Sequence, residues 1–539
     1  MNFNWQIIRN SLYYTSEEMG IALRNSAYSP NIKERMDHSA AIFDWEGRLL
    51  AQAEHIPVHL GSLPIGLSNT LKYMEKEGME FREGDMVVLN NPYIAGTHLN
   101  DVTLIRPIFF NGKIIAYVAN KAHHSDVGGK VPGSISMDAR SLFEEGIIID
   151  PVFIMHNNEF SEDIISIFSS NSRNPYERKG DIRAQAAANF TGERRLIELL
   201  KKYGEVDFME SAEDFLNYSR NLFEKNISAL NEGSYYANEY LELDERDIEL
   251  KVKIDIYGNR VKVDYTGTDA QVRAPLNAVL GVTVSGVHYV FKTILGEWIP
   301  VNHGTFINID INVPSGTVLN PEFPYPVAGG NVETSQRNAD LLYLALSNAA
   351  PKIIPAASGG SMNNVMVGGV HKGNTWAFYE TIGVGTGGKM GRDGTDGIHA
   401  NMTNTMNTPV EEIERNFPLL ILKYEFRENS CGIGEFRGGT GLIRSYMALD
   451  NLIFTVLSDR IRHRPYGLFG GEPGKSTEII VKRKGKRIRC GSKFTLDLSP
   501  GDSVEIRTAG GGGYGDPSKR TEEKIIEDIK NGIIKGRLK

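Results

Sequence analysis

Hydrophobic residues recur at helical spacing in the first segment of the chain, which predicts an opening helix over residues 5–27. Ser29-Pro30 ends this run. Alternating apolar and polar positions then predict strands. Residues 39–53 read as a hairpin turning at 44–47, and apolar runs follow at 86–89, 102–110 and 113–120.

A second helical pattern covers residues 182–230, where apolar positions are interleaved with charges. Strict alternation over 248–256 and 261–265 around Gly258-Asn259 predicts an antiparallel hairpin. Residues 321–407 are crowded with glycine and asparagine, typical of loops over a site or of tight turns between short strands. The remainder is strand-like, with a hairpin turn at Lys484-Gly485 and a short helix predicted over 519–534.

These patterns predict a mixed α/β (α+β), multidomain fold with antiparallel, strand-rich middle and C-terminal regions. The 539 residues exceed what one hydrophobic core usually organises. We expect an N-terminal α/β domain over 1–235 and a mixed β-rich domain with Gly/Asn-rich loops over 236–420. A C-terminal β-rich region with a terminal helix is expected over 421–539.

Composition and charge exclude several classes of function. A net charge of -8 and a pI near 5.9 give no basic footprint for nucleic acid. No apolar run reaches the roughly eighteen residues of a membrane span, and no signal-peptide pattern opens the chain, so we expect a cytoplasmic protein without a membrane partner. Cys431 and Cys490 are too few for a disulfide framework or a zinc knuckle.

Imidazole and carboxylate groups stand at the ends of two predicted strands, in residues 97–101 (THLND) and 122–126 (AHHSD). If these strands pair, His98, Asp101 and His123 converge on one ion, with Asp37 as the natural fourth ligand. Nitrogen and oxygen ligands suit a borderline divalent ion such as zinc, manganese or iron. The alternative is that the histidines are satisfied core or surface residues and the aspartates cap turns.

Neighbouring histidines complicate the choice of ligand. Successive strand residues point to opposite faces, so only one of His123 and His124 should bind the ion, while the other orients substrate or supports a ligand. Pro57 prevents a helix that would align His55 with His59, which favours cleft-lining roles for both.

Three glycine-rich segments resemble known loops or flexible turns. Residues 383–388 (GVGTGG) fit a dinucleotide-binding pattern and 469–476 (FGGEPGKS) approach a phosphate-binding loop, but neither precedes a helical pattern. Residues 509–517 (AGGGGYGDP) are interpreted as a flexible or tightly turned loop near a partner. The chain therefore shows no ATP site of its own.

Several longer motifs resemble the hydantoinase B family, which includes the B subunits of ATP-dependent N-methylhydantoinases, the matching half of 5-oxoprolinases and subunits of acetone carboxylases. The resemblance covers essentially the whole chain. The motifs that carry it are SPNIKERMDHS (29–39), AEHIPVHLGS (53–62), KAHHSDVGG (121–129), RKGDIRAQ (178–185), GGNVETSQR (329–337), SGGSMNN (358–364) and TDG (395–397).

The resemblance implies one divalent metal, zinc or manganese, held by Asp37, His98, Asp101 and His123. It also implies a hetero-oligomer with a hydantoinase A-like ATPase subunit, which binds ATP and phosphorylates the carbonyl oxygen of a cyclic amide. Phosphorylation creates a good leaving group, and the metal activates water at neutral pH.

Further roles follow from this chemistry as hypotheses. His124 or Asp126 is the candidate proton acceptor. Loops 331–337 and 358–364 are candidate substrate-binding segments through Asn331, Arg337, Ser358 and Asn363. Arg337 and Arg183 fit structural ion pairs equally well.

Two rival functions remain at this point. The first is a carboxylase subunit of the acetone or acetophenone type, although such subunits are usually longer than this chain. The second is a non-catalytic scaffold that completes the ATPase and holds no tightly bound metal.

Overall fold

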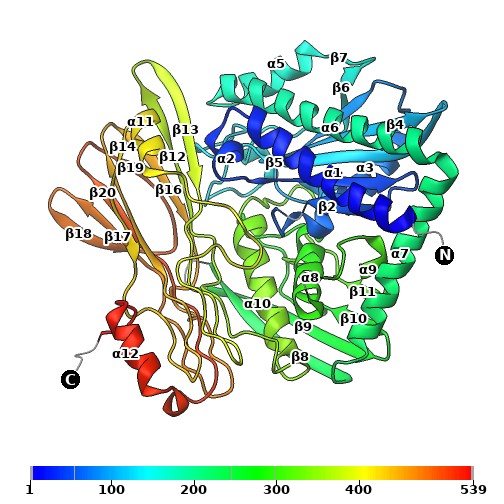
Figure 1. The fold of residues 1–539 in the computed structure, drawn as a ribbon. Helices are drawn as coiled ribbons and strands as arrows, with labels where there is room; N and C mark the ends of the chain where they lie inside the picture. The colour runs from blue at the N-terminus through cyan, green and yellow to red at the C-terminus, as the bar shows by residue number, and fades with distance from the viewer. Residues whose placement is uncertain (1–3, 54, 244–245, 297, 536–539) are drawn as a thin grey trace.

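The computed structural model describes residues 4–53, 55–243, 246–296 and 298–535. They form an N-terminal α/β unit, a middle unit with its own sheet, and a C-terminal β-sandwich (Figure 1). The predicted mixed α/β, multidomain class with antiparallel middle and C-terminal regions is confirmed. Within the described residues, no helix is both long and apolar enough to cross a membrane.

An antiparallel seven-stranded sheet forms the frame of the N-terminal unit, in the order β2-β1-β5-β4-β3-β6-β7. The predicted hairpin over 39–53 corresponds to β1 and β2. The strands are β1 (His38–Asp44), β2 (Leu49–Ala53), β3 (Met86–Leu89), β4 (Asp101–Phe110), β5 (Lys113–His123), β6 (Val152–His156) and β7 (Glu159–Phe160).

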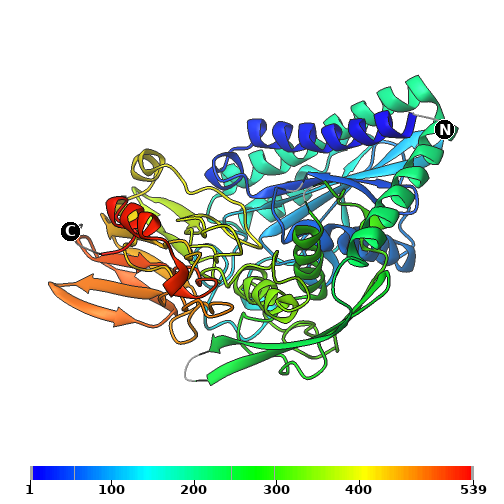
Figure 2. The same ribbon diagram turned by 60° about the horizontal axis from the view of Figure 1, so that its bottom comes forward.

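Helices cover both faces of this sheet. α1 (Asn4–Ser26), α6 (Pro175–Tyr203) and α7 (Glu205–Ile227) bury apolar residues against one face, as Figure 2 shows for α1 and α6. α3 (His59–Lys76) packs on the opposite side. The predicted opening helix is confirmed as α1. Shorter helices are α2 (Pro30–Lys33), α4 (Pro92–Ala95), α5 (Glu162–Ser170) and a 3-10 turn (Leu142–Glu144).

The middle unit combines a sheet of order β11-β10-β9-β8 with helices packed on it. The predicted hairpin is confirmed as β9 (Arg246–Tyr257) and β10 (Arg260–Asp264), while β8 (Gly233–Leu243) and β11 (Ile309–Asn312) complete the sheet. The helices are α8 (Leu280–Leu295), α9 (His303–Phe306), a π-helix (Gly330–Thr334) and α10 (Ser335–Leu346).

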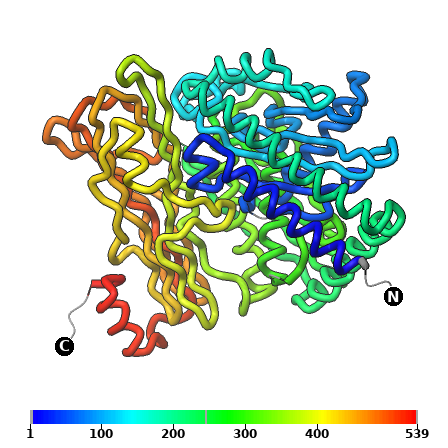
Figure 3. The backbone as a smooth tube through the Cα atoms, turned by 45° about the horizontal axis from the view of Figure 1, so that its top comes forward, coloured from blue at the N-terminus to red at the C-terminus, as the bar shows by residue number. Residues whose placement is uncertain are grey.

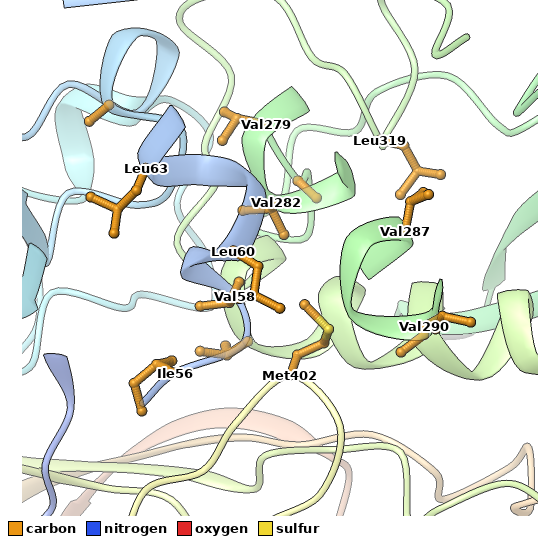
Figure 4. Packing of buried hydrophobic residues seen from close by; sticks show 14 of the residues in the cluster. Ile56, Val58, Leu60, Leu63, Val279, Val282, Val287, Val290, Leu319 and Met402 are labelled. Carbon is orange, nitrogen blue, oxygen red and sulfur yellow. The ribbon is translucent and has the colours of Figure 1, made fainter. Parts of the chain in front are cut away.

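The N-terminal and middle units share one hydrophobic core. Val58, Leu60 and Leu63, at the start of α3, face Val282 on α8, and Met402 packs beneath them (Figure 4). The Val58 amide donates a hydrogen bond to the Met402 carbonyl at 3.3 Å. This core fixes the position of the N-terminal sheet relative to α8 and α10.

Two sheets pack face to face in the C-terminal sandwich, in the orders β13-β12-β16-β19 and β14-β15-β20-β17-β18. The first sheet joins residues on both sides of the predicted boundary at 420/421, because β12 pairs with β16. The strands are β12 (Asn364–His371), β13 (Asn374–Glu380), β14 (Leu419–Phe426), β15 (Leu442–Ala448), β16 (Leu452–Leu457), β17 (Glu478–Arg483), β18 (Lys486–Cys490), β19 (Lys493–Leu498) and β20 (Ser503–Arg507).

Short helices accompany the sandwich. α11 (Val410–Asn416) precedes β14. The helix predicted over 519–534 is shorter, with a 3-10 turn (Pro517–Lys519) followed by α12 (Glu522–Lys530).

The glycine-rich segments form a buried bundle in which backbone packs directly against backbone (Figure 3, yellow to orange-red). The Gly511 amide donates to the Gly439 carbonyl at 2.9 Å, and the Gly439 amide donates to the Thr386 carbonyl at 2.8 Å. A Cβ atom on Gly511 would lie 1.9 Å from the Thr386 carbonyl oxygen. Of the two alternatives for 509–517, this packing favours the tightly turned loop over the flexible one, since glycine is needed there for close packing.

Candidate metal centre

Three potential metal ligands meet where β4 and β5 pair. Asp101 begins β4 and His123 ends β5, and the antiparallel register places them directly opposite each other. His98 lies in the turn that leads into β4. All three side chains are buried. The expected pairing of the two strands is thus present, and it brings His123 next to Asp101, 22 residues earlier in the chain.

The three ligand atoms are close enough for one ion. His98 Nε2 lies 3.0 Å from His123 Nδ1 and 3.1 Å from Asp101 Oδ1, and His123 Nδ1 lies 3.2 Å from the same oxygen. Metal–ligand bonds of about 2.1 Å at right angles separate two ligand atoms by about 3.0 Å. The spacing therefore fits one face of a six-coordinate ion, with positions left for water or substrate.

Hydrogen bonding orients His98 toward this point. Its Nδ1 lies 3.1 Å from the Ala328 carbonyl oxygen, which can only accept, so Nδ1 carries the proton and the Nε2 lone pair faces the cluster. The segment that carries Ala328 is held in turn by the Glu145 carboxylate, which accepts hydrogen bonds from the Val327 and Ala328 backbone amides, each at 3.0 Å. Such outer contacts are typical of metal-binding histidines.

The electrostatics also favour a cation. Burial opposes ionisation of Asp101, but the surrounding imidazoles of His98, His123 and His59 hold its pKa well below the ordinary value. Burial lowers the pKa of His123 below its ordinary value, which favours the neutral ring that binds metals. Among the described residues, His98, Asp101 and His123 form the only group of three or more such side chains whose ligand atoms converge.

Asp37 lies beside the cluster without belonging to that converging group. Its backbone carbonyl accepts a hydrogen bond from the His123 backbone amide at 3.0 Å. Its carboxylate lies 3.5 Å from the side-chain nitrogen of Asn31. Burial alone would lower the pKa of His98, but the charge of Asp101, the hydrogen bonds to Asp101 and to the Ala328 carbonyl, and last the charge of Asp37 together outweigh burial and raise it. The predicted fourth ligand is therefore near the site, but only three ligand atoms converge.

Three further side chains surround the cluster. His59 Nε2 lies 3.4 Å from Asp101 Oδ2, the carboxylate oxygen outside the cluster. The side-chain amide of Asn331 donates a hydrogen bond to the same oxygen at 3.4 Å. The ring of Tyr379 stacks on His123 with centroids 4.6 Å apart. The sequence suggested a cleft-lining role for His59 and a substrate-binding role for Asn331. No sequence signal pointed to Tyr379, a lone aromatic residue on β13.

His124 and Asp126 make their contacts away from these ligand atoms. The buried His124 ring lies 3.0 Å from Gln185 Oε1 and packs edge-on against Phe168, and burial lowers its pKa to about 3. The Asp126 carboxylate accepts from the backbone amides of Gly128 and Gly133 and pairs with Arg173 at 2.9 Å. These contacts stabilise the loop that follows β5.

The other predicted substrate residues lie in separate surroundings. Arg337 is fully buried and pairs with Glu239 at 3.2 Å, and the exposed Arg183 pairs with Glu162 at 2.7 Å, so both occupy the alternative structural role. Ser358 lines a cavity of about 290 Å³.

Asn363 is likewise held by protein contacts. Its side-chain oxygen accepts from the Ser458 hydroxyl at 2.7 Å, and its backbone adopts a left-handed conformation with φ 50°. Of the predicted substrate residues, only Asn331 contacts the cluster in the part of the chain that the structure describes.

A chain of hydrogen bonds connects the π-helix to Tyr379, whose ring stacks on His123. Glu333 Oε1 accepts from the Asn364 side chain at 2.8 Å and from the Met362 amide at 3.1 Å. The Asn364 oxygen in turn accepts from the Tyr379 hydroxyl at 2.9 Å. Burial raises the pKa of Glu333 to about 8. This chain was not foreseen from the sequence, because it joins three distant segments.

Two histidines and one carboxylate whose ligand atoms converge form a buried candidate site for a divalent metal ion in a mixed α/β fold. The family model for Hydantoinase B/oxoprolinase matches residues 1–517. The chain therefore belongs to this family.

Three relatives illustrate the range of the family. An uncharacterized protein of Methanocaldococcus jannaschii is 48% identical, covering 98% of this chain and 93% of the relative. The putative B component of a D-/L-hydantoinase from a Pseudomonas species is 30% identical, covering 98% and 92%. 5-Oxoprolinase 1 of Arabidopsis thaliana is 34% identical over 93% of this chain, which spans only 40% of that longer protein.

A solved structure supports the same placement. The ATP-dependent caprolactamase from Pseudomonas jessenii is 27% identical, with a TM-score of 0.92, and the match covers 99% of this chain and 94% of the caprolactamase chain. The likeness extends through all three units described above.

Proposed function

We propose that this chain is the metal-dependent subunit of an ATP-dependent cyclic amide hydrolase. Its substrate would be a hydantoin, 5-oxoproline or a related lactam whose carbonyl oxygen has been phosphorylated by a separate ATPase subunit. The observation that carries the proposal is the convergence of His98, Asp101 and His123 within 3.0 to 3.2 Å. Membership of the family supports the hydrolase class.

The residues present fit a divalent ion. His98, Asp101 and His123 would hold it, with Asp37 nearby. Zinc or manganese matches this nitrogen and oxygen donor set. The bound ion would act as a Lewis acid that stabilises negative charge on oxygen and eases deprotonation of water near neutral pH.

The protein's own groups prepare the site for this chemistry. Asn331 and His59 contact the outer oxygen of Asp101 and so fix the orientation of the carboxylate. Tyr379 covers one face of His123, and Arg35 lies over the Tyr379 ring at 4.9 Å, which limits the movement of both rings. Held in this way, the three ligands need little reorganisation when charge develops.

The candidate groups for proton transfer are held by contacts of their own. His124 and Asp126 are the residues proposed from the sequence, and their contacts with Gln185 and Arg173 favour a positioning role for both. We retain them in the proposal as groups that support the end of β5, which carries His123.

A separate ATPase is proposed as the partner, in a hetero-oligomer. The matched Pseudomonas relative is named as the B component of a hydantoinase, and the Arabidopsis 5-oxoprolinase has a large additional portion beyond the part that this chain matches. This chain would then use ATP only through its partner.

Coupled assays test the proposal. The purified chain, alone and mixed with the A-type ATPase, is incubated with ATP and hydantoin, 5-oxoproline or caprolactam, and ring opening and ADP release are measured. Ring opening that needs both proteins and ATP supports the proposal, whereas ring opening by the isolated chain without ATP contradicts it.

Parallel reactions with acetone and bicarbonate separate hydrolysis from carboxylation. Consumption of acetone with no ring opening would replace the hydrolase with the carboxylase alternative.

A further inference from the structure

A cationic pocket lies in the C-terminal sandwich, among residues outside the metal centre. It has a volume of about 490 Å³ and forms where β14 ends, β17 begins and β18 ends. Four of its lining side chains are cations and one is an acid: Arg427, Arg464, Lys475, Arg489 and Glu478.

Positive charge is in excess in this pocket. Glu478 is shared by three guanidinium groups, at 3.3 Å from Arg427, 2.9 Å from Arg489 and 3.6 Å from Arg507. In the described part of the chain, no carboxylate lies within 4.0 Å of the amine of Lys475. Arg507 is also paired with Glu505 at 2.6 Å, so the excess rests on the four lining cations, which the single lining carboxylate of Glu478 cannot balance.

The neighbouring hairpin adds to the same field. β17 and β18 and their turn carry six cations over 482–489 (KRKGKRIR), in a chain whose net charge is -8. An alternative explanation for lysine and arginine on an edge strand such as β18 is that they prevent strand pairing between molecules. That role does not account for Arg427 and Arg464, which line the pocket from other segments.

The polar groups of the pocket match an oxyanion. Thr477 lines it with a buried hydroxyl that has no hydrogen-bond partner within the described residues. The Arg464 guanidinium is fixed by the Gly474 and Pro473 carbonyls, each at 2.8 Å. Fixed guanidinium forks and a free hydroxyl are the donors that recognise phosphate oxygens.

We propose that this pocket binds the phosphate group of a small molecule. Lys475 and Ser476 belong to the segment 469–476 that resembles a phosphate-binding loop, but β17 follows them in place of a helix. The pocket therefore recognises phosphate through side chains, and no helix N-terminus contributes. The phosphate can come from inorganic phosphate or from a nucleotide, and the two sources are separated by experiment.

Calorimetric titration of the full chain tests the site. The metal-free protein in EDTA and about 50 mM salt is titrated with inorganic phosphate, pyrophosphate and ADP. The test variant is the double substitution Lys475→Gln and Arg489→Gln, both at exposed side chains. The control is Lys484→Gln and Lys486→Gln, which removes the same amount of charge from the hairpin of β17 and β18 at positions outside the pocket.

The wild type should show saturable binding of at least one probe, weakened at least about tenfold in the test variant and less than about twofold in the control. Tighter binding of ADP than of phosphate assigns the site to a nucleotide, and the reverse assigns it to free phosphate. Absence of saturation for all three probes up to about 10 mM overturns the proposal. Equal losses in both variants would mean general attraction by the hairpin and also overturn it. Should the double variant unfold, Lys475→Gln alone replaces it, since no described carboxylate pairs with Lys475.

Discussion

Replacing Glu333 with glutamine should stabilise the protein and flatten its dependence on pH. Burial raises the pKa of Glu333 from its ordinary value of 4.5 to about 8. A carboxyl group with a raised pKa contributes full stability below 4.5, and this contribution is lost as the pH rises through 8. At about 1.4 kcal/mol per pH unit, the loss reaches about 5 kcal/mol.

Glutamine resembles the protonated carboxyl group in shape and keeps an oxygen for the Asn364 side chain and the Met362 amide. Glu333 Oε2 has no partner in the described structure, so the new amide group displaces no hydrogen bond. The variant should therefore resemble the wild type near pH 5 and exceed it by several kcal/mol near pH 8.

Urea denaturation of the metal-free protein at several pH values measures this difference. The exposed Glu411, on α11, provides the control substitution to glutamine, for which wild-type pH dependence is expected. A Glu333→Gln variant with the same pH slope as the wild type, or with lower stability at pH 8, would refute the assignment of a neutral buried carboxyl group.

Three other substitutions test separate parts of the account. Asp101→Ala should abolish bound metal and leave the fold mostly intact, because the ion is proposed to be catalytic; full metal occupancy by elemental analysis would contradict this. Gly511→Ala should cost about 3 kcal/mol or more, since its Cβ would lie 1.9 Å from the Thr386 carbonyl oxygen, whereas Gly491→Ala meets open space and should leave the melting temperature unchanged. His124→Ala should retain metal and lose turnover if the ring supports the end of β5, and wild-type turnover would remove this role.

Local periodicity was sufficient to predict much of the secondary structure. The hairpin of β9 and β10 follows strict alternation of buried and exposed residues, which is a property of the segment itself. The opposite environments of His123 and His124 follow in the same way from the pleat of β5. By contrast, no strand was predicted for β8, although its residues pair with β9 over the whole of β8.

The glycine bundle shows where sequence reasoning reaches its limit. Freedom of the backbone and close approach between backbones both require glycine, so residues 509–517 carry the same signal for a flexible loop and for a packed one. The contacts that distinguish the two come from residues around 386 and 439, more than seventy positions away in the chain.

The residues of the candidate site also fall into those that the sequence could predict and those that it could not. His98 and Asp101 stand just before one predicted strand and His123 just after the next, so their convergence could be expected once the two strands pair. Tyr379 and Asn331 reach the same point from β13 and the π-helix, and only the packing of three units places them there.

The metal content of the purified chain tests the central claim most directly. Elemental analysis combined with anomalous X-ray diffraction should find one divalent ion per chain, bound by His98 Nε2, Asp101 Oδ1 and His123 Nδ1. A chain purified with its ATPase partner, active in ring opening and without a metal ion between these atoms, would contradict the account.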